Sequence, residues 1–121
     1  MDISKKIAEL KKEPGFTDNV GMILVHNGVV RGWSRADHAS VTEIAIDADR
    51  DKIRKICDEI ESRPGIFKVV AEVNTGTFKP GDDVLFLIVA GDIRENVKSA
   101  LAELLDRVKA ETMSKHEVKI S

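Results

Sequence analysis

The sequence is poor in cysteine and in aromatic residues. Its 121 residues include one cysteine, one tryptophan and no tyrosine. The lone cysteine, Cys57, excludes an internal disulfide and is typical of a protein in a reducing cytoplasm. Few aromatic rings also leave few platforms on which bases or sugars could stack.

Long apolar runs and an excess of positive charge are missing as well. No run approaches the roughly 20 apolar residues that span a membrane, and residues 1–6 are not followed by an apolar segment of signal-peptide type. The net charge of −2 argues against general nucleic-acid binding, which needs a basic surface. We therefore expect a cytoplasmic protein that binds neither membranes nor nucleic acids.

What the sequence does contain is typical of one globular domain over residues 1–121. Its hydrophobic fraction is 42% and its charged fraction is 33%, both ordinary for a protein that buries a core.

Residues 20–33 combine an apolar strand with a glycine-rich end. Residues 20–25 are apolar on both faces of a strand, which predicts a central position in a sheet. Gly28 and Gly32 then bracket Arg31, and glycines in a strand pattern often mark a bulge. Arg31 is the first charged residue after this strand, so its guanidinium should emerge at the edge of the core, where it could hold an anion.

Periodicity predicts the other elements. We expect helices over 3–12, over 50–62 and from 91–95 to 109–111, and strands over 41–47, 66–73, 84–90 and 115–120. The all-apolar strand 84–90 should be central. Asp49 is a candidate N-cap, Asp92 and Glu95 stand in capping-box spacing, and Cys57 falls in an apolar stripe. Residues 75–77 are predicted to be a break and residues 79–82 a tight turn.

The order of these elements predicts an α+β fold, a two-layer split βαβ sheet with an extra N-terminal helix.

The sequence shows no strong catalytic constellation. Its histidines lack metal-ligand spacing with one another or with Cys57, and both a Walker loop and a dinucleotide fingerprint are absent, so we expect no metal site. What remains is a set of cations at the ends of elements, namely Arg31, Arg94, Lys109 and Lys115. Taken alone, each of these cations is better explained as a solvated surface charge than as a site residue.

These cations belong to a series of motifs along the chain. In order, the motifs are Gly28-Val-Val-Arg31, Gly76 with Gly81-Asp82, Ile93-Arg94, Lys109 at a helix end, and Lys115 before Glu117. From about Val20 to Glu117 the series resembles the large, catalytic subunit of molybdopterin synthase. The chain departs from the family pattern in having Ile93 and Asn74 where the family has histidine. It also lacks a Pro and a Trp before Lys115, and the C-terminal extension.

The resemblance implies an α/β-hammerhead fold and a sulfur transferase that needs no metal or cofactor. Such an enzyme converts cyclic pyranopterin monophosphate into molybdopterin. Its sulfur comes from a thiocarboxylate on the Gly-Gly tail of a small ubiquitin-like subunit, and the large subunit is a dimer within a heterotetramer. By resemblance, Arg31 and Arg94 would bind the pterin phosphate, and Lys109 and Lys115 would be catalytic. We expect a lowered pKa for Lys109, from partial burial and from Arg31, Arg94 or Lys115 nearby.

Three other interpretations remain open. The chain could be a non-catalytic paralogue that keeps the dimer and the tail pocket, and the missing histidine favours this view. It could be a ferredoxin-like module that binds a small ligand. An acylphosphatase-like hydrolase is the weakest alternative, suggested only by the segment from Gly28 to Gly32.

Overall fold

The computed structural model describes residues 1–120 and contains six strands in two sheets. Its elements, in chain order, are α1 (Ile3–Leu10), α2 (Phe16–Asn19), β1 (Met22–Val29), β2 (Ser40–Ala48), α3 (Arg50–Glu61), β3 (Ile66–Val73), β4 (Gly76–Phe78), β5 (Asp83–Gly91), α4 (Arg94–Glu111) and β6 (Met113–Ile120). The strand orders are β1-β5-β3 and β4-β2-β6, with antiparallel pairing throughout both sheets. The predicted α+β class is confirmed, and the strands are divided between two sheets.

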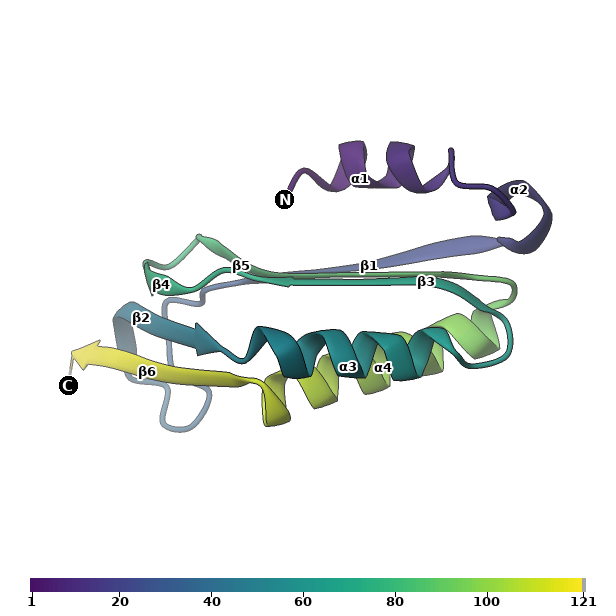
Figure 1. The fold of residues 1–121 in the computed structure, drawn as a ribbon. Helices are drawn as coiled ribbons and strands as arrows, with labels where there is room; N and C mark the ends of the chain where they lie inside the picture. The colour runs from purple at the N-terminus through teal and green to yellow at the C-terminus, as the bar shows by residue number, and fades with distance from the viewer. Residues whose placement is uncertain (121) are drawn as a thin grey trace.

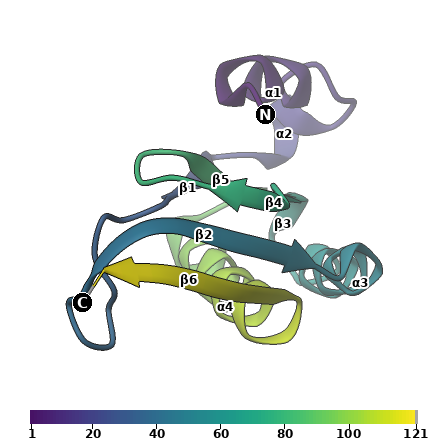
Figure 2. The same cartoon turned by 90° about the vertical axis from the view of Figure 1, so that its left-hand side faces the viewer.

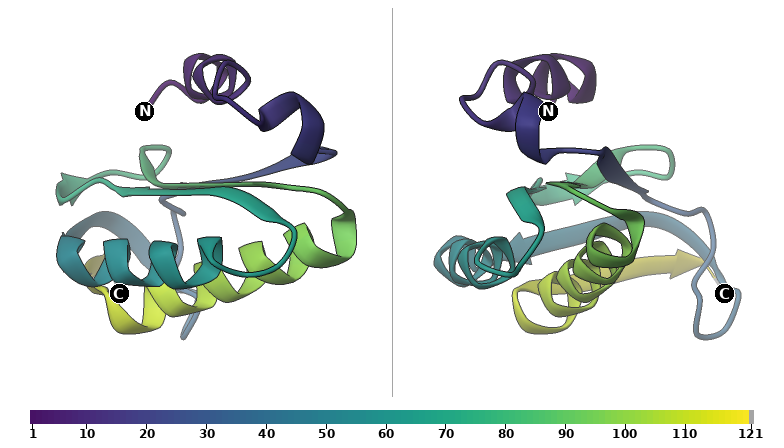
Figure 3. Two further views of the ribbon diagram at one scale, coloured as in Figure 1. Left: turned by 45° about the vertical axis from the view of Figure 1, so that its right-hand side comes forward. Right: turned by 90° about the vertical axis from the view of Figure 1, so that its right-hand side faces the viewer.

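The β1-β5-β3 sheet lies between two helical layers. Figure 1 shows α1 and α2 over one face and α3 and α4 over the other, and Figure 3 shows α3 and α4 side by side beneath the sheet. Strands β2 and β6 continue from the ends of these two helices, so the β4-β2-β6 sheet lies beside them, below one end of the β1-β5-β3 sheet (Figure 2). Within residues 1–120, no helix is both long enough and apolar enough to cross a membrane.

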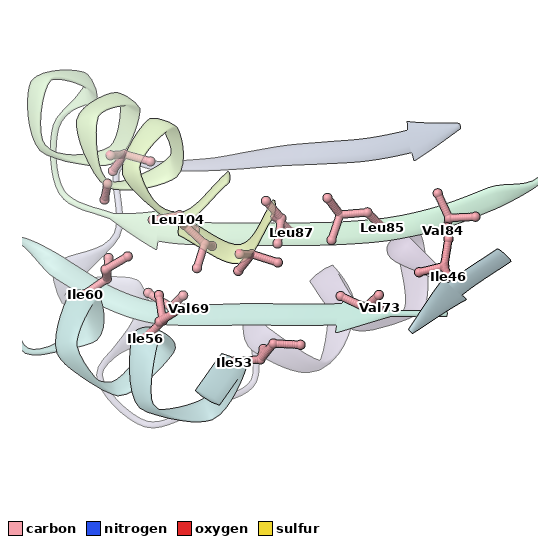
Figure 4. Close-up of a cluster of buried hydrophobic side chains, with 14 of the residues drawn as sticks. Ile46, Ile53, Ile56, Ile60, Val69, Val73, Val84, Leu85, Leu87 and Leu104 are labelled. Atoms are coloured by element: carbon pink, nitrogen blue, oxygen red, sulfur yellow. The ribbon is translucent and has the colours of Figure 1, made fainter. Parts of the chain in front are cut away.

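Strand β5 is the centre of the core. Leu87 belongs to the cluster that β5 forms with α3 and α4, together with Leu104 and Ile56 (Figure 4). The alternate residues Phe86 and Ile88 are also buried, on the face toward the N-terminal helices. Cys57 packs against the core, and burial raises the pKa of its thiol to about 11.

The expectation that the first strand is central was wrong. Strand β1 pairs only with β5 and therefore lies at an edge of its sheet. Its two apolar faces reflect helices on both sides of the sheet, and coverage of the faces says nothing about the number of neighbouring strands. Strand β5, by contrast, is central, as its sequence predicts.

Two short elements, α2 and β4, were not predicted from the sequence. Helix α2 has only four residues and follows Gly15, which has a φ of 88°. Its Phe16 packs edge-on against Phe67 of β3, with ring centroids 5.8 Å apart. Strand β4 lies where the sequence predicts a break, and it gains its partner from β2, far away in the chain. Such short segments depend on tertiary contacts more than on local propensity.

The expected N-terminal caps were confirmed for α3 and wrong for α4, although α4 begins at Arg94, within the predicted range. Asp49 caps α3, since its carboxylate accepts a hydrogen bond from the Lys52 backbone N–H at 3.1 Å. The N-cap of α4 is Ile93, without a side-chain cap bond, and no capping box forms. The Asp92 carboxylate instead accepts hydrogen bonds from the Ile93 backbone and the Asn96 side chain, so it holds the chain just before the helix.

Candidate functional site

A cavity of about 320 Å³ opens between the two sheets, near the C-terminal end of α4. Three of the four predicted site residues line it, namely Arg31, Lys109 and Lys115. Apolar side chains such as Ile44 and Ile46 also contribute to the wall. The cavity therefore combines an apolar wall with several cations, which suits a ligand that has both a flat apolar part and an anionic group.

Arg31 is held at the cavity by the end of β1. The register of the β1–β5 pair shifts between Gly28 and Val29, as the glycine pattern suggests. Beyond the shift, buried Val30 donates its N–H to the Asp82 carbonyl at 3.0 Å and accepts from the Gly81 N–H at 2.9 Å. Val30 is thereby tied to the turn before β5, and the next residue, Arg31, emerges into solvent at the cavity.

The two lysines meet because only Thr112 separates the end of α4 from the start of β6. Lys109 lies in the last turn of α4, directly after fully buried Val108. Thr112 ends the helix with a hydrogen bond from its hydroxyl to the Val108 carbonyl at 2.6 Å. Strand β6 then runs back along β2 and places Lys115 opposite Ile46. Helix end and strand start thus deliver one lysine each to the same cavity.

The pKa of Lys109 is lowered from its ordinary value of 10.5, as predicted from its position. Loss of hydration at the amine is the largest cause, followed by the positive charges of Lys115, Arg31 and Arg35. Arg94 is not among these causes, so that part of the prediction was wrong, and Arg35 takes its place. A lowered pKa increases the fraction of neutral amine near neutral pH.

Arg94 does not reach this cavity within one chain. It is the first residue of α4, whereas Lys109 lies in its last turn. At the rise of an α-helix, about 22 Å separates them along the axis. The Arg94 side chain is 78% exposed, and its Nε lies 3.4 Å from the Glu95 carboxylate.

Three further cavity residues were not identified from the sequence as site residues. His26 of β1 has a covered Nε2 without a hydrogen-bond partner, and burial, aided by the charge of Lys109, lowers its pKa. Trp33 follows Arg31 after one glycine, and Glu117 of β6 accepts a hydrogen bond from the Ser34 hydroxyl at 3.4 Å. The position of His26 on a predicted strand, two residues before Gly28, was the available signal.

The described part of the chain contains no cluster of side chains that could ligate a metal ion. Among residues 1–120, no group of three His, Cys, Asp or Glu side chains gathers closely enough to hold a metal ion.

A family model described as MoaE protein matches residues 1–111. The chain belongs to the MoaE family. The resemblance to the large subunit of molybdopterin synthase is thereby confirmed.

Solved structures of the MoaE fold agree with this membership. A molybdopterin biosynthesis MoaE protein from Burkholderia ambifaria is 21% identical, with a TM-score of 0.75 over 99% of this chain and 81% of its own. Molybdopterin synthase from Staphylococcus aureus is 21% identical, with a TM-score of 0.72 over 84% of this chain and 77% of its own. A complex of subunits 1 and 2 of the molybdopterin-converting factor from Helicobacter pylori matches at 14% identity and a TM-score of 0.70, over 98% of this chain and 80% of its own. At such identities the likeness establishes the fold. No protein with a curated description matches the sequence.

Two departures of this MoaE-family chain from the family pattern, Ile93 and Asn74, lie away from the cavity. Ile93 is 54% exposed beside Arg94, at the far end of α4. Asn74 follows β3 and donates its side-chain N–H to the Asp83 carbonyl at 2.9 Å, which fastens the start of β5. Neither residue lines the cavity that holds Lys109.

Proposed function

We propose that this MoaE-family chain is the large subunit of a molybdopterin synthase. In this role it transfers sulfur from a small-subunit thiocarboxylate to cyclic pyranopterin monophosphate, which yields molybdopterin. The observation that supports this best is the convergence of Arg31, Lys109 and Lys115 on one cavity. An anionic substrate and an acyl group would both meet positive charge there.

Each cation has a distinct chemical task in this proposal. The guanidinium of Arg31 presents a planar fork of donors that matches a phosphate. The amine of Lys109, when charged, polarises the acyl carbonyl of the thiocarboxylate. When neutral, its lone pair can attack the acyl carbon once the thiocarboxylate sulfur has bonded to the pterin. The bond between acyl carbon and sulfur then breaks, the sulfur stays on the pterin, the amine loses a proton, and water later releases the tail as a carboxylate. The lowered pKa makes the neutral amine more accessible. Lys115 adds a second charge for the acyl oxygen.

The partner that we propose is a small ubiquitin-like sulfur carrier with a C-terminal Gly-Gly. The Helicobacter pylori relative is described as a protein–protein complex of two subunits, which supports a partner of this kind. An extended tail without side chains could enter the cavity and bring its terminal thiocarboxylate to Lys109. We expect both subunits to act in the cytoplasm.

We also propose that the chain is a homodimer within a heterotetramer. Both sheets have unpaired edge strands, and β1 ends in Val29, which is 49% exposed. A second copy would additionally reconcile the position of Arg94 with a substrate role, because Arg94 could then serve the cavity of the other copy. Light scattering at micromolar concentration should give twice the mass of the chain, and a monomer mass would contradict the proposal.

A non-catalytic paralogue is the second candidate. The observation in its favour is the exposed Ile93 where the family has histidine. Such a chain would still bind the small subunit but would not turn over the precursor.

One reconstitution separates the two candidates. The chain is mixed with a thiocarboxylated small subunit and with cyclic pyranopterin monophosphate, and the dithiolene product is measured. A small subunit with an ordinary carboxylate terminus is the matched control. Product that depends on the thiocarboxylate supports the synthase, whereas tight subunit binding without product supports the paralogue.

A further inference from the structure

The loop between β1 and β2 is tightly built. Its ends are joined by hydrogen bonds of 2.8 Å from the Ser34 N–H to the Ala39 carbonyl and from the His38 N–H to the Ser34 carbonyl. The Asp37 carboxylate accepts from the Ala39 N–H and is paired with Lys119 of β6 at 3.2 Å. The loop is therefore anchored to the same strand that carries Lys115.

This loop presents the only tryptophan of the sequence to the cavity. Trp33 lines the cavity and is still 44% exposed. The Arg31 guanidinium carbon lies 4.6 Å from the centroid of its ring. The His38 imidazole stacks on the indole, with centroids 5.0 Å apart and an interplanar angle of 14°. A flat ring thus already rests against Trp33, next to a cation.

The imidazole is held there on an unfavourable backbone. His38 has a φ of 58°, and within residues 1–120 it is the only residue other than glycine with a positive φ. This region is disfavoured for residues with a Cβ, although His adopts it more often than most. The side chain of His38 is exposed, so leaving the indole breaks no buried contact. A larger flat heterocycle would cover more of the indole than an imidazole does.

We propose that Trp33 is the stacking wall for the flat heterocycle of the substrate and that His38 occupies the heterocycle's place in the free chain. On binding, His38 leaves the indole, and Arg31 remains beside it to hold the anionic group of the ligand. This inference rests on the proposed function only in identifying the heterocycle as a pterin.

Binding measurements with two probes test the stacking role. Neopterin monophosphate supplies a pterin and a phosphate, and inorganic phosphate supplies the anion alone. Replacing Trp33→Leu should weaken neopterin monophosphate about 5- to 150-fold, the range for loss of one stacked base, and leave phosphate affinity unchanged. Trp33→Phe should restore part of the loss, because an aromatic wall remains. Equal weakening of both probes would mean that Trp33 acts only by positioning Arg31, which overturns the proposal.

A second variant tests displacement of His38. Asn tolerates a positive φ and lacks a ring, so His38→Asn keeps the loop backbone while removing the competitor. Neopterin monophosphate should bind a few-fold more tightly to this variant, and phosphate should bind as before. Unchanged or weaker pterin binding would contradict displacement. Since the sequence has one tryptophan and no tyrosine, protein fluorescence reports on Trp33 directly and should change on pterin binding but not on phosphate binding.

The failure of the proposed function is distinguishable from the failure of this inference. The unaltered chain could fail to bind neopterin monophosphate but bind flavin mononucleotide with an affinity that Trp33→Leu lowers. That result would support the stacking role of Trp33 and contradict the pterin as substrate. If neopterin monophosphate binds the unaltered chain and Trp33→Leu equally well, the stacking role of Trp33 is contradicted and the proposed substrate is still supported.

Discussion

Strands β5 and β6 represent two regions built for opposite purposes. Eight of the nine residues of β5 are buried, and β5 lies at the centre of its sheet. Strand β6 lies at the edge of the other sheet, and none of its residues 113–119 is buried. Strand β5 excludes water from the core and stabilises the fold. Strand β6 holds Lys115 and Glu117 at a cavity where Lys109 and Arg31 repel each other, so the candidate site lies on a strand that contributes little to the core.

The largest expected effect comes from the β5 side of this comparison. Leu87 is fully buried, and Leu87→Ala should lower the free energy of unfolding by about 2–5 kcal/mol through lost burial and a new cavity. The matched variant on β6 is Val118→Ala, where the side chain is 44% exposed and the change should stay within about 0.5 kcal/mol. Chemical denaturation measures both. Similar losses would mean that the two strands contribute equally to stability.

The next largest effect is on the rate of sulfur transfer and concerns the cavity beside β6. Lys109→Arg keeps a positive charge but cannot supply a neutral amine, so single-turnover sulfur transfer should slow about 100-fold or more. Binding of the small subunit and the precursor should persist. Lys115→Arg, on exposed β6, is the control and should be milder. Transfer by Lys109→Arg at the parent rate would leave Lys109 only a positioning charge.

The third effect concerns affinity and should leave the core untouched. Arg31→Ala should weaken the binding of a phosphate-bearing pterin by roughly 1.5–3 kcal/mol, because a charge-assisted hydrogen bond is lost. Its unfolding free energy should change by no more than about 0.5 kcal/mol, since Arg31 is exposed. Calorimetric titration and thermal melting measure the two quantities, with exposed Arg54→Ala of α3 as control. A lower melting temperature with unchanged affinity would assign Arg31 to the fold.

The smallest effect is the stability cost of the clustered cations. The pKa of Lys109 is lowered in the folded chain, so its charged form is disfavoured there. The resulting penalty is present at neutral pH and disappears as pH rises through the folded pKa toward 10.5. Lys109→Met should therefore raise unfolding free energy at neutral pH, by no more than about 0.5 kcal/mol for a group that keeps much of its water.

The pH dependence of that gain is the measurement. Denaturation of Lys109→Met and of the parent chain should differ most near neutral pH and less as pH approaches 10.5. Lys98→Met, an exposed lysine on the same helix, is the control and should show no such trend. A gain that does not vary with pH would point to apolar packing in place of relieved repulsion.

The long helices and strands, and several residues of the candidate site, could be predicted from the sequence. The apolar periodicity of α4 and the uninterrupted apolar run of β5 identify both elements, because such patterns depend on residues close in the chain. Placing Arg31 and Lys109 at element ends was equally local. The edge position of β1 and the existence of β4 were missed, since both depend on which strands pair, and the pairing partners lie far away in the sequence.

The sequence by itself determined that this chain folds as an α+β domain, and its motifs identified the family. Only the tertiary structure decided which cations share a cavity. Arg31, Lys109 and Lys115 meet because β1, α4 and β6 converge at one end of the β1-β5-β3 sheet, whereas α4 carries Arg94 to the opposite end. It also placed His38 on Trp33, which no periodicity predicts, because that contact depends on one loop residue with a positive φ. Local patterns set the elements, and long-range pairing set the chemistry that they present.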